Sequence, residues 1–149
     1  MIALGCDHGG YELKQEIIKY LEEHNLEYTD FGCDSLESTD YPIYAKRVAI
    51  AVQSGDCDKG ILICGTGIGV SIAANKVPGA YAALVSDVYS AQRARLSNDA
   101  NIMCMGAFTT GNKERELFVD AFLTNEFVPG CASQPKVDAF HKYDEEHSK

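Results

Sequence analysis

The sequence predicts an α/β protein built on a parallel, doubly wound sheet with helices on both faces. Short apolar segments recur along the 149 residues, and each is followed, after a short connection, by a segment with helical periodicity. Strands that alternate with helices pair in parallel, because each helix carries the chain back to the starting edge of the sheet. We therefore expect five such repeats in a single domain spanning residues 1–149.

Apolar and β-branched residues cluster between turn residues at the five expected strands, Met1–Gly5, Leu26–Phe31, Ile61–Cys64, Ala80–Val85 and Ile102–Met105. Helices are expected at Tyr11–Glu23, Ile43–Ser54, the segment that ends at Asn75, Ser86–Leu96 and Asn112–Leu123. Asp40 supplies a cap for the second helix, and Pro42 suits its first turn. The loops after the strands should meet at one edge of the sheet, where such folds bind ligands.

Composition and charge limit the classes of function. The hydrophobic content of 46% is enough for a sizeable core in one domain. A net charge of −9 argues against a surface for nucleic acid or for an anionic membrane. The chain enters a strand at its first residues and has no apolar run of roughly 18 residues, so we expect a cytoplasmic protein.

The segment 127–149 differs from the repeats before it. Pro129-Gly130 interrupts the chain, and Ser133-Gln134-Pro135 starts a charged helix that runs to about Glu146. This helix could pack on its own domain or reach across to a second subunit, and the pattern leaves both arrangements open.

The segment from Gly60 to Asn75 is the most informative part of the chain. Its strand ends at Cys64, and Gly65, Gly67 and Gly69 alternate directly afterwards. A glycine turn that opens a helix presents bare N–H groups and the positive end of the helix dipole, which favour bound negative charge. The same field favours a thiolate at the cysteine. A base beside an anion site is what proton abstraction next to a carbonyl requires.

Other functions of this turn fit the sequence less well. It is not a P-loop, because no Gly-Lys-Ser/Thr follows. Its glycine spacing also differs from that of dinucleotide-binding turns, although Asp87 lies roughly 20 residues on, where a ribose-binding carboxylate would be. A nucleotide-binding regulatory module remains an alternative from another class, as does a turn that only packs a helix against a strand.

The six cysteines do not predict a metal site, because no Cys/His spacing resembles one and no C-x-x-C pair occurs. We expect Cys6 and Cys104, at the ends of apolar runs, to be small buried hydrophobic residues. Cys64 alone has a neighbourhood that would activate its thiol.

Four further segments carry candidate residues, each with an ordinary structural explanation beside the functional one. Asp7 and His8 follow the first strand, where they could bind a hydroxyl and a phosphate or could only cap and hydrogen-bond. Tyr41 could lie over a sugar ring or only help to start a helix. Ser71 could support Cys64 or face the core, and Ser97-Asn98-Asp99-Ala100-Asn101 could be a plain polar turn.

Taken together, these motifs resemble the family of ribose-5-phosphate isomerase B and its galactose-6-phosphate isomerase relatives. The resemblance covers the first four-fifths of the chain, and its motifs are Gly5-Cys6-Asp7-His8-Gly9-Gly10, Thr39-Asp40-Tyr41-Pro42, Ile63-Cys64-Gly65-Thr66-Gly67-Ile68-Gly69-Val70-Ser71-Ile72-Ala73-Ala74-Asn75-Lys76 and Asn98-Asp99-Ala100-Asn101. It implies a Rossmann-like αβα sandwich with a five-stranded parallel sheet and a C-terminal helix. It also implies a homodimer or tetramer with shared active sites, and neither cofactor nor metal.

The resemblance assigns roles to single residues. Cys64 would be the base that moves a proton between C1 and C2 through an enediolate, with Thr66 and the turn amides holding the oxyanion. The substrate-binding residues would be Asp7, His8, Tyr41, Gly65, Gly67, Ile68, Gly69, Ser71, Asn98 and Lys136. Of these, Asn98 and Lys136 would come from the partner subunit, on which the tail 127–149 would pack.

The chain departs from the family's pattern at several positions. Ser97 stands where the family has a ring-opening histidine, and serine cannot supply a proton near neutral pH as imidazole can. Phosphate-binding arginines are expected near Phe108, Ala132 and Lys136, and only Lys136 is positively charged.

The resemblance and the residues together predict an aldose–ketose isomerase of sugar phosphates, with ribose 5-phosphate and ribulose 5-phosphate as substrate and product. The departures leave open an isomerase of a six-carbon sugar phosphate, of the galactose 6-phosphate or allose 6-phosphate type, or of a free sugar. A relative that has lost activity and survives as a binding partner is a third reading, which the retention of Cys64 and Thr66 disfavours.

Overall fold

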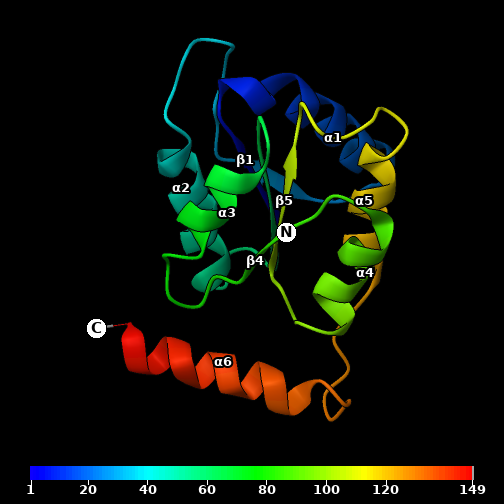
Figure 1. Ribbon diagram of the computed structural model, residues 1–149. Coiled ribbons are helices and arrows are strands. Elements are labelled where there is room, and N and C mark those ends of the chain that lie inside the picture. Colours follow the sequence, from blue (N-terminus) through cyan, green and yellow to red (C-terminus); the bar gives the residue numbers. More distant parts are fainter. Residues whose placement is uncertain (149) are drawn as a thin grey trace.

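The protein forms a three-layer α/β sandwich around a five-stranded sheet (Figure 1). The structure, a computed structural model, describes residues 1–148. All strands run in parallel in the order β2-β1-β3-β5-β4, and their bounds are β1 Ile2–Cys6, β2 Tyr28–Asp30, β3 Lys59–Cys64, β4 Ala82–Leu84 and β5 Ile102–Gly106. The predicted fold class is confirmed, because each apolar segment became a strand of one parallel sheet.

Helices cover both faces of this sheet. On one face lie α2 (Tyr41–Gln53) and α3 (Ile68–Ala74), and on the other lie α1 (Tyr11–Glu23), α4 (Val88–Leu96) and α5 (Arg115–Thr124). The last helix, α6 (Gln134–His147), crosses beneath the sheet at the end where the strands begin (Figure 1). Within residues 1–148, no helix is long and apolar enough to cross a membrane.

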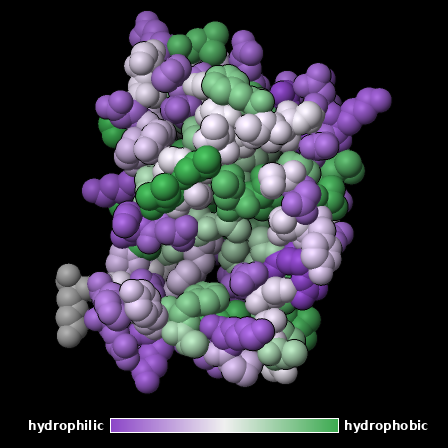
Figure 2. Space-filling view, viewed as in Figure 1, coloured by the Kyte–Doolittle hydropathy of each residue, from purple (hydrophilic) through white to green (hydrophobic). Residues whose placement is uncertain are grey.

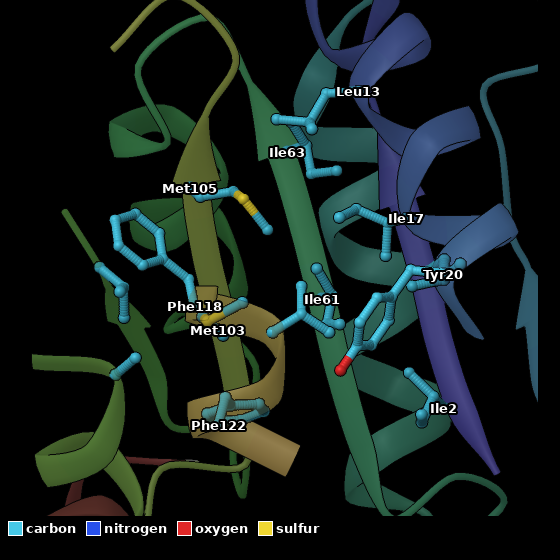
Figure 3. Packing of buried hydrophobic residues seen from close by; sticks show 14 of the residues in the cluster. Ile2, Leu13, Ile17, Tyr20, Ile61, Ile63, Met103, Met105, Phe118 and Phe122 are labelled. Carbon is cyan, nitrogen blue, oxygen red and sulfur yellow. The ribbon is translucent and has the colours of Figure 1, made fainter. Parts of the chain in front are cut away.

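The core is divided by the sheet into two apolar clusters. Figure 3 shows the larger one, in which Ile17 and Tyr20 of α1 pack against Ile61 of β3 while Phe118 and Phe122 of α5 pack against β5. The central strands β1, β3 and β5 are buried along nearly their whole length. They are therefore apolar at successive positions, as expected for strands covered on both faces.

Several elements differ from the sequence-based bounds by one to three residues at an end. β2 and β4 are three residues each, shorter than predicted, because they are the edge strands and pair on one side only. The helix expected from Asn112 begins at Arg115, after a turn closed by the Glu114 N–H donating to the Gly111 carbonyl. Asp40 stands at the start of α2 as predicted, but its side chain makes no capping hydrogen bond there.

The three central strands end level with one another at the carboxyl edge of the sheet. Cys6 pairs with Ile63, and Cys64 pairs with Gly106. A buried lysine braces this edge, because Lys14 on α1 donates to both carboxylate oxygens of Asp30 at 2.7 and 2.9 Å and also to the Cys33 carbonyl. Paired in this way, the buried charge ties β2 and the following loop to α1.

At the opposite, amino edge of the sheet, asparagine side chains form hydrogen bonds with backbone groups as a neighbouring strand would. Asn101 accepts from the Tyr81 N–H and donates to the Gly79 carbonyl, while Asn75 bonds both the N–H and the carbonyl of Ala82. Helix α6 joins this network through Asp144, which accepts from the Gly79 N–H and the Tyr81 hydroxyl. The tail therefore does pack on its own domain, and whether it also contacts a partner stays a prediction.

Candidate active site

The predicted base, Cys64, is the last residue of β3 and is only 4% exposed. The turn after it depends on Gly67, whose φ of +79° is left-handed and whose added Cβ would lie 2.8 Å from the backbone of Met105. That conformation directs the Gly67 N–H to the Cys64 Sγ at 3.1 Å. Negative charge on the sulfur would strengthen this contact, since hydrogen bonds to ionised acceptors are the strong ones.

Two N–H groups of the predicted anion site already donate to side chains of the turn itself. Besides the Gly67 N–H on Cys64, the Ile68 N–H donates to the Thr66 hydroxyl oxygen at 3.3 Å. Thr66 thus accepts through its oxygen, which leaves its hydroxyl hydrogen to be donated elsewhere. Ser71, one turn into α3, donates to the Ile68 carbonyl instead of to Cys64.

The loop after β5 is fastened onto the turn. The Ala107 N–H donates to the Cys64 carbonyl, and the Phe108 N–H donates to the Gly65 carbonyl. Gly106 permits this approach, because a Cβ there would lie 2.6 Å from the Thr66 carbonyl carbon. The neighbouring strands β3 and β5 are therefore joined through their loops at the site as well as through the sheet.

Two aromatic rings flank the glycine turn. The Tyr41 ring lies so close to Gly69 that a Cβ there would be 2.5 Å from it, and the Phe108 ring lies within 2.9 Å of the corresponding position at Gly65. The Tyr41 side chain is thus placed beside the turn, where we predicted contact with a sugar. Sequence reasoning did not predict that Phe108 would cover the turn, since this position depends on how two loops pack.

Asp7 and His8 come to the same edge from β1. Asp7 caps the short 3-10 helix His8–Gly10 through one carboxylate oxygen, which accepts from the Gly10 N–H at 3.1 Å. The His8 Nδ1 accepts from the Thr39 N–H at 3.1 Å, so the proton of the neutral ring lies on Nε2, which can donate to a ligand. A Cβ at Gly10 would lie 2.6 Å from the Ile63 carbonyl oxygen, and glycine is what lets this loop lie against β3.

Two other thiols in the sheet are kept protonated by burial. Burial raises the pKa of Cys6 to about 12, and it raises the pKa of Cys104 far above its ordinary value, with the neighbouring Cys64 adding to that rise. Both were predicted to be buried hydrophobic residues, and both are fully buried.

Asp87, the candidate ribose-binding residue of the nucleotide alternative, is engaged by its own helix. It caps α4, where its carboxylate accepts from the N–H and the hydroxyl of Ser90 at 2.7 and 2.8 Å. The Ser90 hydrogen bonds hold the Asp87 pKa below its usual value. This carboxylate already has its partners, which disfavours the nucleotide interpretation.

The structure does not bring Asn98, Ser97 and Lys136 to Cys64 within one chain. Asn101 bonds the backbone of Gly60 at the start of β3, so the segment before β5 lies one strand length, roughly 13 Å, from Cys64. Lys136 is on α6 at this same amino edge. These residues can serve a Cys64 site only if it belongs to another chain.

Arg93 is a candidate site residue that the sequence did not predict. Its Nε donates to the Ser97 hydroxyl oxygen at 2.6 Å, so a guanidinium lies beside the residue that stands in the histidine position. The i, i+4 spacing of the two residues on one helix was the available signal.

Side chains for a metal are not gathered anywhere in the described chain. Across residues 1–148, no group of three or more His, Cys, Asp or Glu side chains is placed to hold a metal ion.

Comparison with known proteins shows the family and the fold. The family described as Ribose/Galactose Isomerase matches residues 2–140. Ribose-5-P isomerase B of Listeria innocua is 50% identical over 146 residues, which are 98% of either chain. Among solved structures, ribose-5-phosphate isomerase B of Clostridium thermocellum superposes with a TM-score of 0.94 at 44% identity, over 98% of either chain.

A second solved structure carries a sugar phosphate. Ribose-5-phosphate isomerase B of Mycoplasma genitalium, with bound ribulose-5-phosphate, superposes with a TM-score of 0.91 at 38% identity, over 97% of this chain and 96% of that one. The family match over residues 2–140 includes all five strands and the loops at the carboxyl edge of the sheet. This chain belongs to the ribose/galactose isomerase family.

Proposed function

We propose that the protein interconverts ribose 5-phosphate and ribulose 5-phosphate. The observation that carries this proposal is the Cys64 thiol, buried at the end of a central strand, with the Gly67 N–H on its sulfur and with Asp7 and His8 on the adjoining strand end. Relatives that align over nearly the whole chain are named for this activity.

Cys64 acts as the base of the reaction. As a thiolate it takes the proton from C2 of the open-chain aldose, the C–H electron pair forms the C1–C2 double bond, and the carbonyl oxygen on C1 becomes an oxyanion. A proton then passes from the C2 hydroxyl to the C1 oxygen, and the thiol returns its proton to C1 to give the ketose. Atoms and electrons balance without a redox partner, because the oxidation of C2 equals the reduction of C1.

The turn and the loop after β1 hold the substrate around this step. The Thr66 hydroxyl and the unoccupied turn amides stabilise the enediolate oxygen, which is where charge develops. The second carboxylate oxygen of Asp7 accepts from sugar hydroxyls. The His8 Nε2–H donates to the far end of the sugar, which carries the phosphate.

The complete site is formed between two copies of the chain, in a dimer or a pair of dimers. Figure 2 shows hydrophobic side chains gathered over α3 and β4, and the exposed residues there include Ile68, Ile72, Leu84 and Tyr89. An apolar surface of this kind on an acidic protein favours association. A pocket between β4 and α6, lined by Asn98, Tyr81 and Phe140, adjoins it on the same face.

In a two-fold symmetric dimer, the glycine turn after Cys64 of each copy would lie against this pocket of the other copy, because every contact across such an interface occurs twice. Asn98 and Lys136 would thereby reach the partner's Cys64, which their own chain does not let them do.

The cytoplasm is the compartment that fits the cysteines. All six are free, and the Cys6 and Cys33 sulfurs lie 3.8 Å apart without being bonded. Close unpaired thiols are typical of a reducing environment.

Conversion of ribose 5-phosphate in D₂O, followed by NMR, tests the proposed function. We expect ribulose 5-phosphate to appear with deuterium at C1, because the proton on Cys64 exchanges with solvent during the step. A protein that converts neither sugar, or that transfers hydrogen without any exchange in either direction, would contradict the proposed chemistry. ATP and NAD, added as a calorimetric control, should not bind.

A further inference from the structure

Two buried thiols, Cys6 and Cys33, stand beside the residues proposed to bind the sugar. Their sulfurs are 3.8 Å apart, and both side chains are almost fully buried. Cys6 ends β1 immediately before Asp7 and His8, and Cys33 starts the loop that leads to Thr39. Because the Thr39 N–H donates to the His8 ring, the thiol pair lies where the two segments that meet at His8 begin.

The backbone holds the two cysteines at a separation that suits a disulfide. The Cys33 N–H donates to the Cys6 carbonyl at 2.9 Å, and the Cys6 N–H donates to the Gly32 carbonyl at 2.8 Å. Backbones that are hydrogen-bonded in this way lie about 5 Å apart. Disulfides join residues whose Cα atoms are about 4.4 to 6.8 Å apart. To form the bond, the sulfurs have to approach from 3.8 Å to about 2.05 Å.

The thiol hydrogens distinguish the two sulfurs. The Cys33 thiol donates to the Ser35 carbonyl at 3.3 Å, so the hydrogen between the two sulfurs is the one that Cys6 donates to Cys33. A donated hydrogen favours negative charge on the sulfur that accepts it. Lys14, which is fully buried, adds a positive charge here, because its Nζ donates to the Cys33 carbonyl. Cys33 is therefore the nucleophile of the pair.

We propose that Cys6 and Cys33 are a site of reversible oxidation, at which hydrogen peroxide forms a disulfide that weakens binding of the sugar at His8. The Cys33 sulfur attacks one peroxide oxygen, the O–O bond breaks, and the products are a sulfenic acid and water. The Cys6 sulfur then displaces the sulfenic hydroxyl, which leaves as a second water with the proton of the Cys6 thiol. Both sulfurs are oxidised, the peroxide is reduced, and a small-molecule thiol reverses the change.

The disulfide alters the loop after β2 more than it alters β1. Cys6 is held within the sheet, since β1 pairs with both β2 and β3, whereas the five residues that follow Cys33 are all exposed. Oxidation also removes the thiol hydrogen that Cys33 donates to the Ser35 carbonyl. The loop thereby loses a contact near its start, and we expect the Thr39 N–H to move away from the His8 Nδ1. His8 then loses the fixed tautomer that keeps a proton on Nε2.

Peptide mapping of the wild-type protein tests whether the disulfide forms. The folded protein is treated with hydrogen peroxide, its remaining thiols are blocked with iodoacetamide, and it is digested without reduction. We expect a cross-linked pair of peptides that contains Cys6 and Cys33, and dithiothreitol should separate the two. Overoxidation of Cys33 to a sulfinic acid without any cross-link, or two thiols that stay reduced, overturns the proposal.

Kinetics with ribose 5-phosphate test the consequence for binding, which rests on the proposed function. Cys33→Ser keeps a hydroxyl hydrogen for the Ser35 carbonyl but cannot form the disulfide. We expect peroxide to raise the KM of the wild type about tenfold, reversibly by dithiothreitol, and to leave the KM of Cys33→Ser unchanged. Cys131→Ala is the control and should respond like the wild type. Direct oxidation of Cys64 lowers kcat in all three proteins, so an equal response of the wild type and Cys33→Ser overturns the role of the pair.

A measurement without turnover separates this inference from the isomerase proposal. The ¹⁵N resonances of the His8 ring, assigned with His8→Asn, report which nitrogen carries the proton. We expect a single tautomer in the reduced protein and a mixture after oxidation. If the disulfide forms and this change follows while no sugar is converted, only the isomerase proposal fails. A disulfide that leaves both the His8 resonances and the KM unchanged overturns the effect on the site.

Discussion

The two edges of the sheet differ in how far their polar groups are already paired. At the amino edge Asn75, Asn101 and Asp144 are bonded to backbone of the same chain, and Arg95 donates to Asp99, Glu126 and the Ala100 carbonyl. At the carboxyl edge His8 and Thr66 accept one hydrogen bond each and keep a donor free. Polar groups that the fold has not used are the ones a ligand can use, and this points to the carboxyl edge as the reactive one.

Asn98 differs from the paired polar residues of the amino edge, because it is exposed and lines the pocket beside α6. If each edge of the sheet holds half of an active site, substitutions at the two edges should have different effects on activity.

The largest effect is expected at Cys64. Changing it to Ala removes the base while opening little space at a strand end, so turnover of ribose 5-phosphate should fall about 10²-fold or more with the thermal midpoint nearly unchanged. Cys131→Ala, which alters the half-exposed thiol in the tail, is the matched control and should remain active. An active Cys64→Ala enzyme would remove the central assignment.

Complementation between chains tests whether the two edges meet across an interface. Cys64→Ala and Asn98→Ala should each be poorly active alone, but a mixed dimer contains one site with both residues intact. After random exchange of subunits, about a quarter of the wild-type activity should return. Mass spectrometry of the mixture would confirm exchange, and full exchange without recovered activity would mean that the site is not shared.

A smaller effect is expected from Ser97→His. An imidazole can protonate the ring oxygen of a cyclic aldose near neutral pH, so the rate with ribose 5-phosphate should rise several-fold. The rate at saturation (kcat) with ribulose 5-phosphate, which cannot close a ring through its phosphorylated C5 oxygen, should change less. The comparison uses kcat, because the equilibrium constant fixes the ratio of kcat/KM for the two directions. Ser97→Ala is the control for releasing Arg93 from its contact with the Ser97 hydroxyl. Equal changes in both directions would show that Ser97 does not occupy an acid's position.

The smallest effect concerns the docking of α6. Hydrogen bonds from the Tyr81 hydroxyl and the Gly79 N–H lower the Asp144 pKa below its ordinary value of 3.8. A lowered carboxyl pKa stabilises the folded state above that value, and the stabilisation is lost as the pH falls through the folded pKa. Asp144→Asn should therefore lower the thermal midpoint by a few degrees near pH 7, with the difference shrinking below about pH 4. A difference that persists undiminished in acid would show that charge is not what Asp144 contributes.

The sequence predicted the fold well where periodicity was strong. Helix α1 has the predicted bounds, and β1, β3 and β5 lie within two residues of theirs, since buried central strands have a continuous apolar signal. The edge strands were overestimated, because their ends depend on pairing with one neighbour, which the local sequence does not report.

The candidate site was predictable to the extent that it follows from strand order. Asp7 directly follows β1 and Cys64 ends the neighbouring strand β3, so their proximity follows once the sheet is parallel. The ring of Phe108 over Gly65 depends on two loops packing together, and the Thr39 bond to His8 joins residues 31 positions apart. Neither has a local signal. The roles of the site residues in catalysis and binding stay predictions.

The side-chain amide of Asn75 has a consequence for how the sheet ends. Ala82 belongs to an edge strand, and such a strand offers free N–H and carbonyl groups on which another strand can grow, a common route to aggregation. Asn75 occupies both of these groups on Ala82 with its own amide, at 2.8 and 2.9 Å. The outward-facing backbone groups of Ala82 are thereby occupied by the chain itself and cannot pair with a sixth strand.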